Sequence, residues 1–173
     1  MIDELIDIVD EKDLVIGQIY RSEAWQKKLK NFRTINAFLL NDKKEIWIPR
    51  RSAHKKLFPL CLDSSVGGHV IAGEDYDQAL KRELLEELSI ELAQTSYTFL
   101  AKLIPTQHNI STYTQVYIIY TNINPQYNKD DFIDSTWISI EKLQEKIKSG
   151  VPVKSDLAIL VHCLQQYLKL GTI

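Results

Sequence analysis

The segment from Gly68 to Ile90 constrains the folding of this 173-residue chain more than any other part of the sequence. Asp75 followed three residues later by Gln78 is the pattern of a capping box, which starts a helix through reciprocal bonds between side chain and backbone. Apolar residues then recur at helical spacing, which predicts a helix over about residues 76–88 with one buried stripe. The stripe consists of Ala79, Leu80, Leu84, Leu85 and Leu88.

The same helix carries a group of carboxylates. Glu83, Glu86 and Glu87 are i, i+3 and i+4 neighbours, so they share one face beside the apolar stripe. Carboxylate oxygens suit Mg²⁺, which combines a few carboxylates with waters and substrate phosphates. We interpret residues 65–69, which contain two glycines, as a turn that lets the backbone approach such a ligand. A solvated helix face explains the glutamates equally well, because exposed like charges cost only about a few tenths of a kcal/mol.

The spacing of these residues resembles the Nudix box of the Nudix hydrolase superfamily. The residues that fit the box are Gly68, Glu74, Arg82, Glu83, Leu84, Glu86, Glu87 and Ile90. Ser89 departs from the pattern, since the family has glycine at this helix exit. Serine adopts the left-handed backbone of such an exit at a cost of about 1 kcal/mol, so the departure concerns the turn more than the chemistry.

The resemblance implies both a fold and a reaction. The fold is of the α/β (α+β) class, with a mixed β-sheet sandwiched between α-helices, which the order of strands and helices along the chain also fits. The reaction uses Mg²⁺ or Mn²⁺ and attack of water on a phosphorus of a nucleoside diphosphate linked to another group. By position, Glu83, Glu86 and Glu87 would be the metal ligands and catalytic residues, and which of them serves as base stays open.

Three further residues of the box are expected to support its shape. Arg82 would hold the turn against the helix, through either an i,i+4 pair with Glu86 or a contact with Glu74. Gly68 would contribute a backbone carbonyl or its torsion angles, and a tight turn alone explains it equally well.

Substrate-binding residues are expected outside the helix. Family members often use a further acid, and we choose Asp131, although a solvated loop acid is the simpler reading. Arg50 is our choice for contacting phosphates among four basic residues, Arg50, Arg51, Lys55 and Lys56, each of which would also suit an exposed loop. His69 could bond to ligand or be a structural histidine. Tyr113 and Tyr117 alternate on one strand, where they would stack a base or fill the core.

Several segments look like the isopentenyl-diphosphate-isomerase-like branch of the Nudix proteins. They are residues 10–17, 21–24, Arg33, 58–59 and 65–69. In our alignment Gly67 stands at the isomerase's cysteine and Phe32 at a metal-binding histidine, and Cys61 lies six residues from the cysteine position. We therefore expect hydrolysis of a diphosphate compound. One alternative is isopentenyl-diphosphate delta-isomerase. The other is a non-catalytic Nudix-fold binding module, and the intact acidic triad argues against this second alternative.

Composition limits the partners. A net charge of −2 gives no reason to expect a nucleic-acid polymer, whose phosphates usually need a clustered basic surface. Two cysteines suggest no disulfide framework, and we expect a cytoplasmic protein without a membrane segment that binds a small-molecule diphosphate. An N-terminal hairpin offers an edge through which two copies would form a homodimer.

We expect a single Nudix domain over residues 1–173. Residues 1–30 would form a β-hairpin and a short helix, residues 31–150 the catalytic core, and residues 151–173 a C-terminal helix. Apolar alternation predicts strands at 5–9, 14–21, 34–40, 45–50, 97–106, 113–121 and 137–138. Capping and periodicity predict further helices at 22–29, 139–149 and 155–170, with 51–64 as a polar loop.

Overall fold

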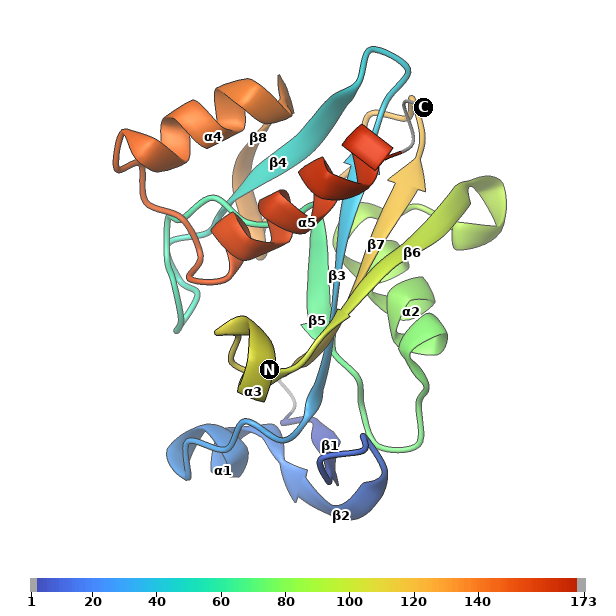
Figure 1. Ribbon diagram of the computed structural model, residues 1–173, viewed down its shortest axis with the longest axis vertical. Helices are drawn as coiled ribbons and strands as arrows, with labels where there is room; N and C mark the ends of the chain where they lie inside the picture. The colour runs from blue at the N-terminus through green and yellow to red at the C-terminus, as the bar shows by residue number, and fades with distance from the viewer. Residues whose placement is uncertain (1–2, 171–173) are drawn as a thin grey trace.

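The computed structural model describes residues 3–170, which contain a six-stranded mixed sheet and a separate two-stranded hairpin (Figure 1). The sheet has the order β6-β7-β3-β4-β8, and β5 also pairs with β3. β3 and β7 run parallel, whereas the other paired strands are antiparallel. The strands of this sheet are β3 (Arg33–Leu40), β4 (Glu45–Arg51), β5 (Val66–His69), β6 (Ser96–Leu103), β7 (Tyr113–Tyr120) and β8 (Phe132–Ser139).

Helices cover both faces of the sheet (Figure 1). α2 (Tyr76–Leu88) packs on one face, and α4 (Ile140–Lys148) with α5 (Leu157–Leu170) packs on the other. This confirms the predicted α+β class, in which a mixed sheet lies between helices. Within residues 3–170, no helix has the length and apolar character needed to cross a membrane.

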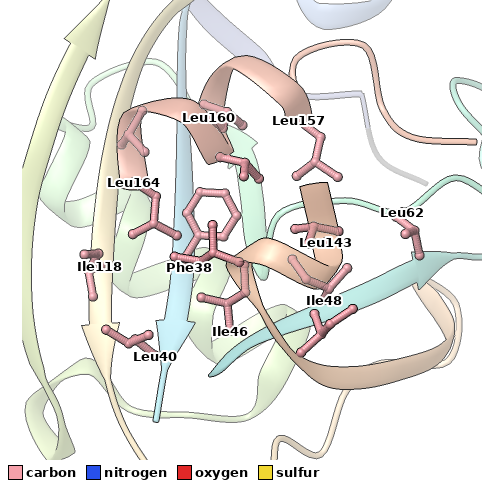
Figure 2. Close-up of a cluster of buried hydrophobic side chains, with 14 of the residues drawn as sticks. Phe38, Leu40, Ile46, Ile48, Leu62, Ile118, Leu143, Leu157, Leu160 and Leu164 are labelled. Carbon is pink, nitrogen blue, oxygen red and sulfur yellow. The ribbon is translucent and has the colours of Figure 1, made fainter. Parts of the chain in front are cut away.

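The alternation of side chains along β3 explains the two layers. Ile35, Ala37 and Leu39 point into the core beneath α2, whereas Phe38 and Leu40 point into the core beneath α4 and α5 (Figure 2). Successive strand residues face opposite sides of a sheet, so an uninterrupted apolar run is what a strand buried on both faces requires. β3 is therefore the centre of both cores.

The N-terminal hairpin and the helix after it are confirmed. β1 (Leu5–Val9) pairs with β2 (Val15–Tyr20), and α1 (Arg21–Gln26) follows directly. They share a small core of their own, formed by Ile6, Ala24 and Phe32. In Figure 1 the hairpin and α1 lie together at the end of the sheet where β3 begins.

A network of charges around the buried carboxylate of Asp63 joins the loop before β5 to the segment before α5. Asp63 Oδ2 accepts a 2.6 Å bond from Arg51 Nη1, and Asp63 Oδ1 lies 3.3 Å from Lys154 Nζ. Burial by itself raises the pKa of Asp63, but the charges of Lys154 and Arg51 outweigh it and hold that pKa below its ordinary value. The network closes the loop of residues 52–65 over the edge of the sheet.

Three sequence-based boundaries were wrong. The glycine-containing segment 65–69 is largely strand β5 and not a turn, because it pairs with β3 from Thr34 to Ala37. The brief strand expected at 137–138 is the eight-residue β8, and the strand expected at 97–106 ends at Leu103 before the short helix α3 (Pro105–His108). Leu85, placed in the buried stripe, is 50% exposed, since it lies on the far side of α2 from the sheet.

We predict that Asp63→Asn lowers the free energy of unfolding by about 3 kcal/mol, because it removes a buried carboxylate that two partly buried cations share. Asp134→Asn is the matched control. Its pair with Arg50 is largely exposed, so the loss should stay below about 1 kcal/mol. Urea unfolding followed by circular dichroism measures both, and equal losses in the two variants would contradict the assignment of a buried network.

Candidate active site

The helix that carries the carboxylates starts and ends as its sequence predicts. Gln78 N–H donates to Asp75 Oδ1 at 2.8 Å, and Asp75 N–H donates to Gln78 Oε1 at 2.8 Å, which completes the capping box. Ser89 ends the helix in the left-handed region, with φ 55° and ψ 33°. The serine thus takes the backbone conformation that glycine adopts more cheaply, and the turn keeps its shape.

Gly68 admits the carboxylate of Glu83 to the edge of the sheet. A Cβ atom added to Gly68 would lie 1.9 Å from Glu83 Oε1, so any other residue would collide with the carboxylate. Among the described glycines only Gly73 and Gly150 have positive φ. The torsion-angle explanation for Gly68 was therefore wrong, and the close approach of a neighbouring side chain explains the glycine.

Arg82 ties the box together through its guanidinium group. Nε and Nη2 donate to the two oxygens of Glu74 at 2.9 and 3.0 Å, a bidentate pair. Nη2 also donates to the His69 carbonyl at 2.8 Å, and Nη1 donates to Glu83 Oε1 at 2.7 Å. Glu86 Oε2 lies farther away, at 3.4 Å from Nη1. Arg82 thus makes both of the contacts considered for it, and the pair with Glu74 has the better geometry.

Glu87 is partly buried and bonds to the backbone of β5. Its Oε2 accepts a 3.1 Å bond from Gly67 N–H. Burial raises the pKa of Glu87 well above its ordinary value, and the nearby charges of Glu83 and Asp131 raise it further. Burial likewise raises the pKa of Glu83 to about 7, although Arg82 opposes the shift. The positive charge near Glu83 and Glu87 is therefore too small to balance the negative charge of both carboxylates.

A divalent cation fits these residues. The two carboxylates with raised pKa values, Glu83 and Glu87, would regain their charge beside a dication, and oxygen donors are those that Mg²⁺ and Mn²⁺ prefer. Glu86, whose side chain is 60% exposed, faces solvent beside them. Within residues 3–170 no three acidic, histidine or cysteine side chains are gathered closely enough to form a complete ligand set. Glu83, Glu86 and Glu87 would hold such a metal together with substrate oxygens.

Asp131 and Arg50 lie in different surroundings. Asp131 Oδ1 is paired with Lys55 Nζ, and its charge reaches Glu87. Arg50 is turned away, with Nε 3.2 Å from Asp134 Oδ2 and Nη1 donating to a loop carbonyl. The structure thus brings Asp131 toward the carboxylates and leaves Arg50 at the exposed end of β4. Lys55 is the cation of the loop that lies beside Asp131, and no spacing in the sequence distinguishes it from its basic neighbours.

The backbone and the ring of His69 contact different residues. Its carbonyl accepts the bond from Arg82, while its ring lies 5.7 Å from Phe32 and 5.8 Å from Trp25 between ring centroids. Burial lowers the pKa of His69 to about 3, helped by the charge of Arg21, so the imidazole is neutral at physiological pH. The ring therefore packs as an aromatic side chain.

The structure also shows the surroundings of the two strand tyrosines and of the two residues aligned with the isomerase's cysteine and histidine. Tyr113 and Tyr117 are 6% and 1% exposed, and Tyr117 donates to Asp77 on α2, so they fill the core. Gly67 has no room for a side chain without a shift, since an added Cβ would lie 2.9 Å from Asn36 Oδ1. Phe32 is buried in the core of the hairpin.

We predict that Gly68→Ala weakens Mn²⁺ binding about 10-fold or more, because the added methyl group displaces Glu83. Gly17→Ala is the control, since nothing lies within 4 Å of a Cβ added there. The free Mn²⁺ signal in electron paramagnetic resonance measures binding. Equal affinities in the two variants would show that Glu83 is not a ligand.

Comparison with known proteins agrees with this geometry. The model of the NUDIX domain family matches residues 30–157. An uncharacterized Nudix hydrolase of Nostoc sp. is 49% identical over 159 residues, covering 92% of this chain and 94% of that protein. The crystal structure of DR0079 from Deinococcus radiodurans superposes with a TM-score of 0.88 at 41% identity, covering 92% of this chain and 98% of that one.

A more distant similarity links the chain to the isomerases. Isopentenyl-diphosphate Delta-isomerase 1 of Photorhabdus laumondii is 26% identical over 154 residues, covering 85% of this chain and 86% of that protein. The Nostoc and Deinococcus proteins are much closer in sequence, at 49% and 41% identity. The family match over residues 30–157 and the 49% identical relative show that the chain belongs to the Nudix hydrolase family.

Proposed function

We propose that this protein is a Mg²⁺- or Mn²⁺-dependent hydrolase that cleaves the pyrophosphate linkage of a nucleoside diphosphate derivative or a related diphosphate compound. The observation that carries the proposal is the pair of neighbouring carboxylates on one face of α2, the buried Glu83 and the partly buried Glu87, both with raised pKa values. Such an arrangement is costly for stability alone, whereas it suits a group that binds a dication.

The residues of the chain have separate tasks in this proposal. Glu83, Glu86 and Glu87 would hold the cation, which when bound would lower the pKa of a water and stabilise charge on the phosphates. Arg82 keeps Glu83 in place, and the N–H of Gly67 orients Glu87. None of these groups acts as a nucleophile, so water attacks phosphorus directly.

Binding of the substrate would involve the segments that flank the carboxylates. Asp131 would serve as the additional acid, and the Lys55 ammonium paired with it would turn to a phosphate of the substrate. Arg50 would reach a phosphate only by leaving Asp134, an exposed pair that is cheap to break. His69 would contribute through its backbone, because its ring is stacked in the aromatic core.

The surface and composition support the remaining parts of the proposal. The net charge of −2 favours a small diphosphate compound over a nucleic-acid polymer as partner. The outer edge of β2 is apolar and exposed, with Val15 at 50% and Ile16 at 64%, which favours pairing with a second copy. Free cysteines at 61 and 163 are consistent with a cytoplasmic location.

We predict that Glu86→Gln and Glu87→Gln each lower turnover at least about 100-fold, because each removes a charged metal ligand. The assay incubates the protein with a panel of nucleotide sugars, dinucleotides and nucleoside triphosphates and measures released phosphate or monophosphate. Removal of metal with EDTA should abolish turnover, and added Mg²⁺ should restore it.

The control for this experiment is Glu91→Gln, an exposed glutamate just beyond α2. It should hydrolyse substrate at the rate of the unchanged protein. Full activity of both Glu86→Gln and Glu87→Gln would remove the proposed mechanism.

We also predict that the protein does not isomerise isopentenyl diphosphate. Glycine at position 67 offers no thiol for proton transfer, and Phe32 offers no metal-binding nitrogen. Incubation with Mg²⁺ and isopentenyl diphosphate, followed by chromatography of the products, tests this. Formation of the dimethylallyl isomer would replace hydrolysis with isomerisation as the function.

A further inference from the structure

The N-terminal hairpin touches the segment of residues 69–76, which links β5 to the carboxylate helix. The hairpin precedes the part of the chain matched by the family model, which begins at residue 30. It adds little to the main cores, because its own buried cluster is small and β2 is almost entirely exposed. Its backbone contacts with the segment are the bridge between Ile6 and Ile71 and the 2.8 Å bond from Ala72 N–H to the Leu5 carbonyl.

Asp7 of β1 bonds directly to the turn before the helix. Its Oδ2 accepts a 3.2 Å bond from Gly73 N–H, and its Oδ1 accepts a 3.0 Å bond from Gln18 Nε2 across the hairpin. The side chain is 5% exposed, so water does not replace these bonds easily. Gly73 has φ +85° and directly precedes Glu74, the partner of Arg82.

Asp13 in the turn of the hairpin bonds to the first residue of α2. Tyr76 Oη donates to Asp13 Oδ2 at 3.0 Å, and Arg33 Nε donates to Asp13 Oδ1 at 2.6 Å. Lys102 Nζ also pairs with Asp13, and the Arg33 and Lys102 cations lie 5.5 and 5.8 Å from the centroid of the Tyr76 ring. The start of the helix is thus held by groups from the hairpin and from two strands of the sheet.

These contacts continue to the metal-binding carboxylates through Glu74. The turn that Asp7 holds carries Glu74, and Glu74 takes two of the bonds of the Arg82 guanidinium. Arg82 in turn bonds to Glu83. A shift of the turn would therefore move Arg82 and release Glu83.

We propose that the hairpin is a clamp on the turn before α2, and that Asp7 and Asp13 are positioning residues that set the geometry of the metal-binding carboxylates. The inference rests on the proposed function. It assigns residues outside the family match a role in metal affinity, and it separates them from residues that touch substrate.

The experiment compares Asp7→Ala, Asp7→Asn and Asp42→Ala. Asp7→Ala should raise the dissociation constant of Mn²⁺, measured by electron paramagnetic resonance, about 10-fold. It should shift the half-saturating Mg²⁺ concentration of turnover equally, with kcat at saturating metal nearly unchanged. Asp7→Asn should recover much of the affinity, because Gln18 can reverse its amide and leave the oxygen of the new carboxamide to Gly73 N–H. Asp42→Ala removes an aspartate that bonds to Asn122, far from the box, and should change nothing.

The outcomes separate the clamp from the function. Unchanged Mn²⁺ affinity in a folded Asp7→Ala variant, or an equal loss in Asp42→Ala, would overturn the clamp while leaving hydrolysis intact. Absence of both Mn²⁺ binding and hydrolysis in the unchanged protein would overturn the proposed function itself. If Asp7→Ala does not fold, Tyr76→Phe removes only the bond to Asp13, and it should weaken Mn²⁺ binding severalfold; unchanged affinity there would also overturn the clamp.

Discussion

The guanidinium group of Arg82 is the interaction on which the site depends. It is bonded at once to the turn through Glu74, to the strand through the His69 carbonyl and to the helix through Glu83. Arginine suits this position because its planar fork offers several donors in fixed directions, whereas lysine would satisfy fewer acceptors at a time. A partly buried cation with three anchored partners makes strand, turn and helix move as one unit, which is the rigidity that a set of metal ligands needs.

Two carboxylates of α2 lie where ionisation is unfavourable, because they are partly withdrawn from water. Glu83 and Glu87 lie beside β5 with raised pKa values, and within residues 3–170 the groups that lower these pKa values are Arg82 and the N–H of Gly67. Apolar cores on both faces of β3 supply stability against this cost. In the proposed function, a bound cation would supply the missing positive charge beside these carboxylates.

The chain resembles the isomerases in sequence over most of its length but lacks the two isomerase residues considered above. The same strand that would carry a cysteine at position 67 carries a glycine whose missing side chain leaves space for Asn36. Phe32 and Trp25 surround the ring of His69 and turn that region into an aromatic cluster. Packing thus occupies the two positions at which our alignment places the isomerase's cysteine and metal-binding histidine.

Local patterns in the sequence were sufficient for the helix and its ends, because capping and hydrophobic periodicity act within a few residues. Asp75, Gln78 and Ser89 behave as their types and spacing predict. Tertiary structure alone decided that residues 66–69 form a strand, that Gly68 is required by the approach of Glu83, and that Arg50 faces Asp134 while Lys55 faces Asp131. These features depend on contacts between residues that are 15 to 84 positions apart in the sequence. Such contacts form only when the sheet brings the residues together, so the local sequence pattern does not predict them.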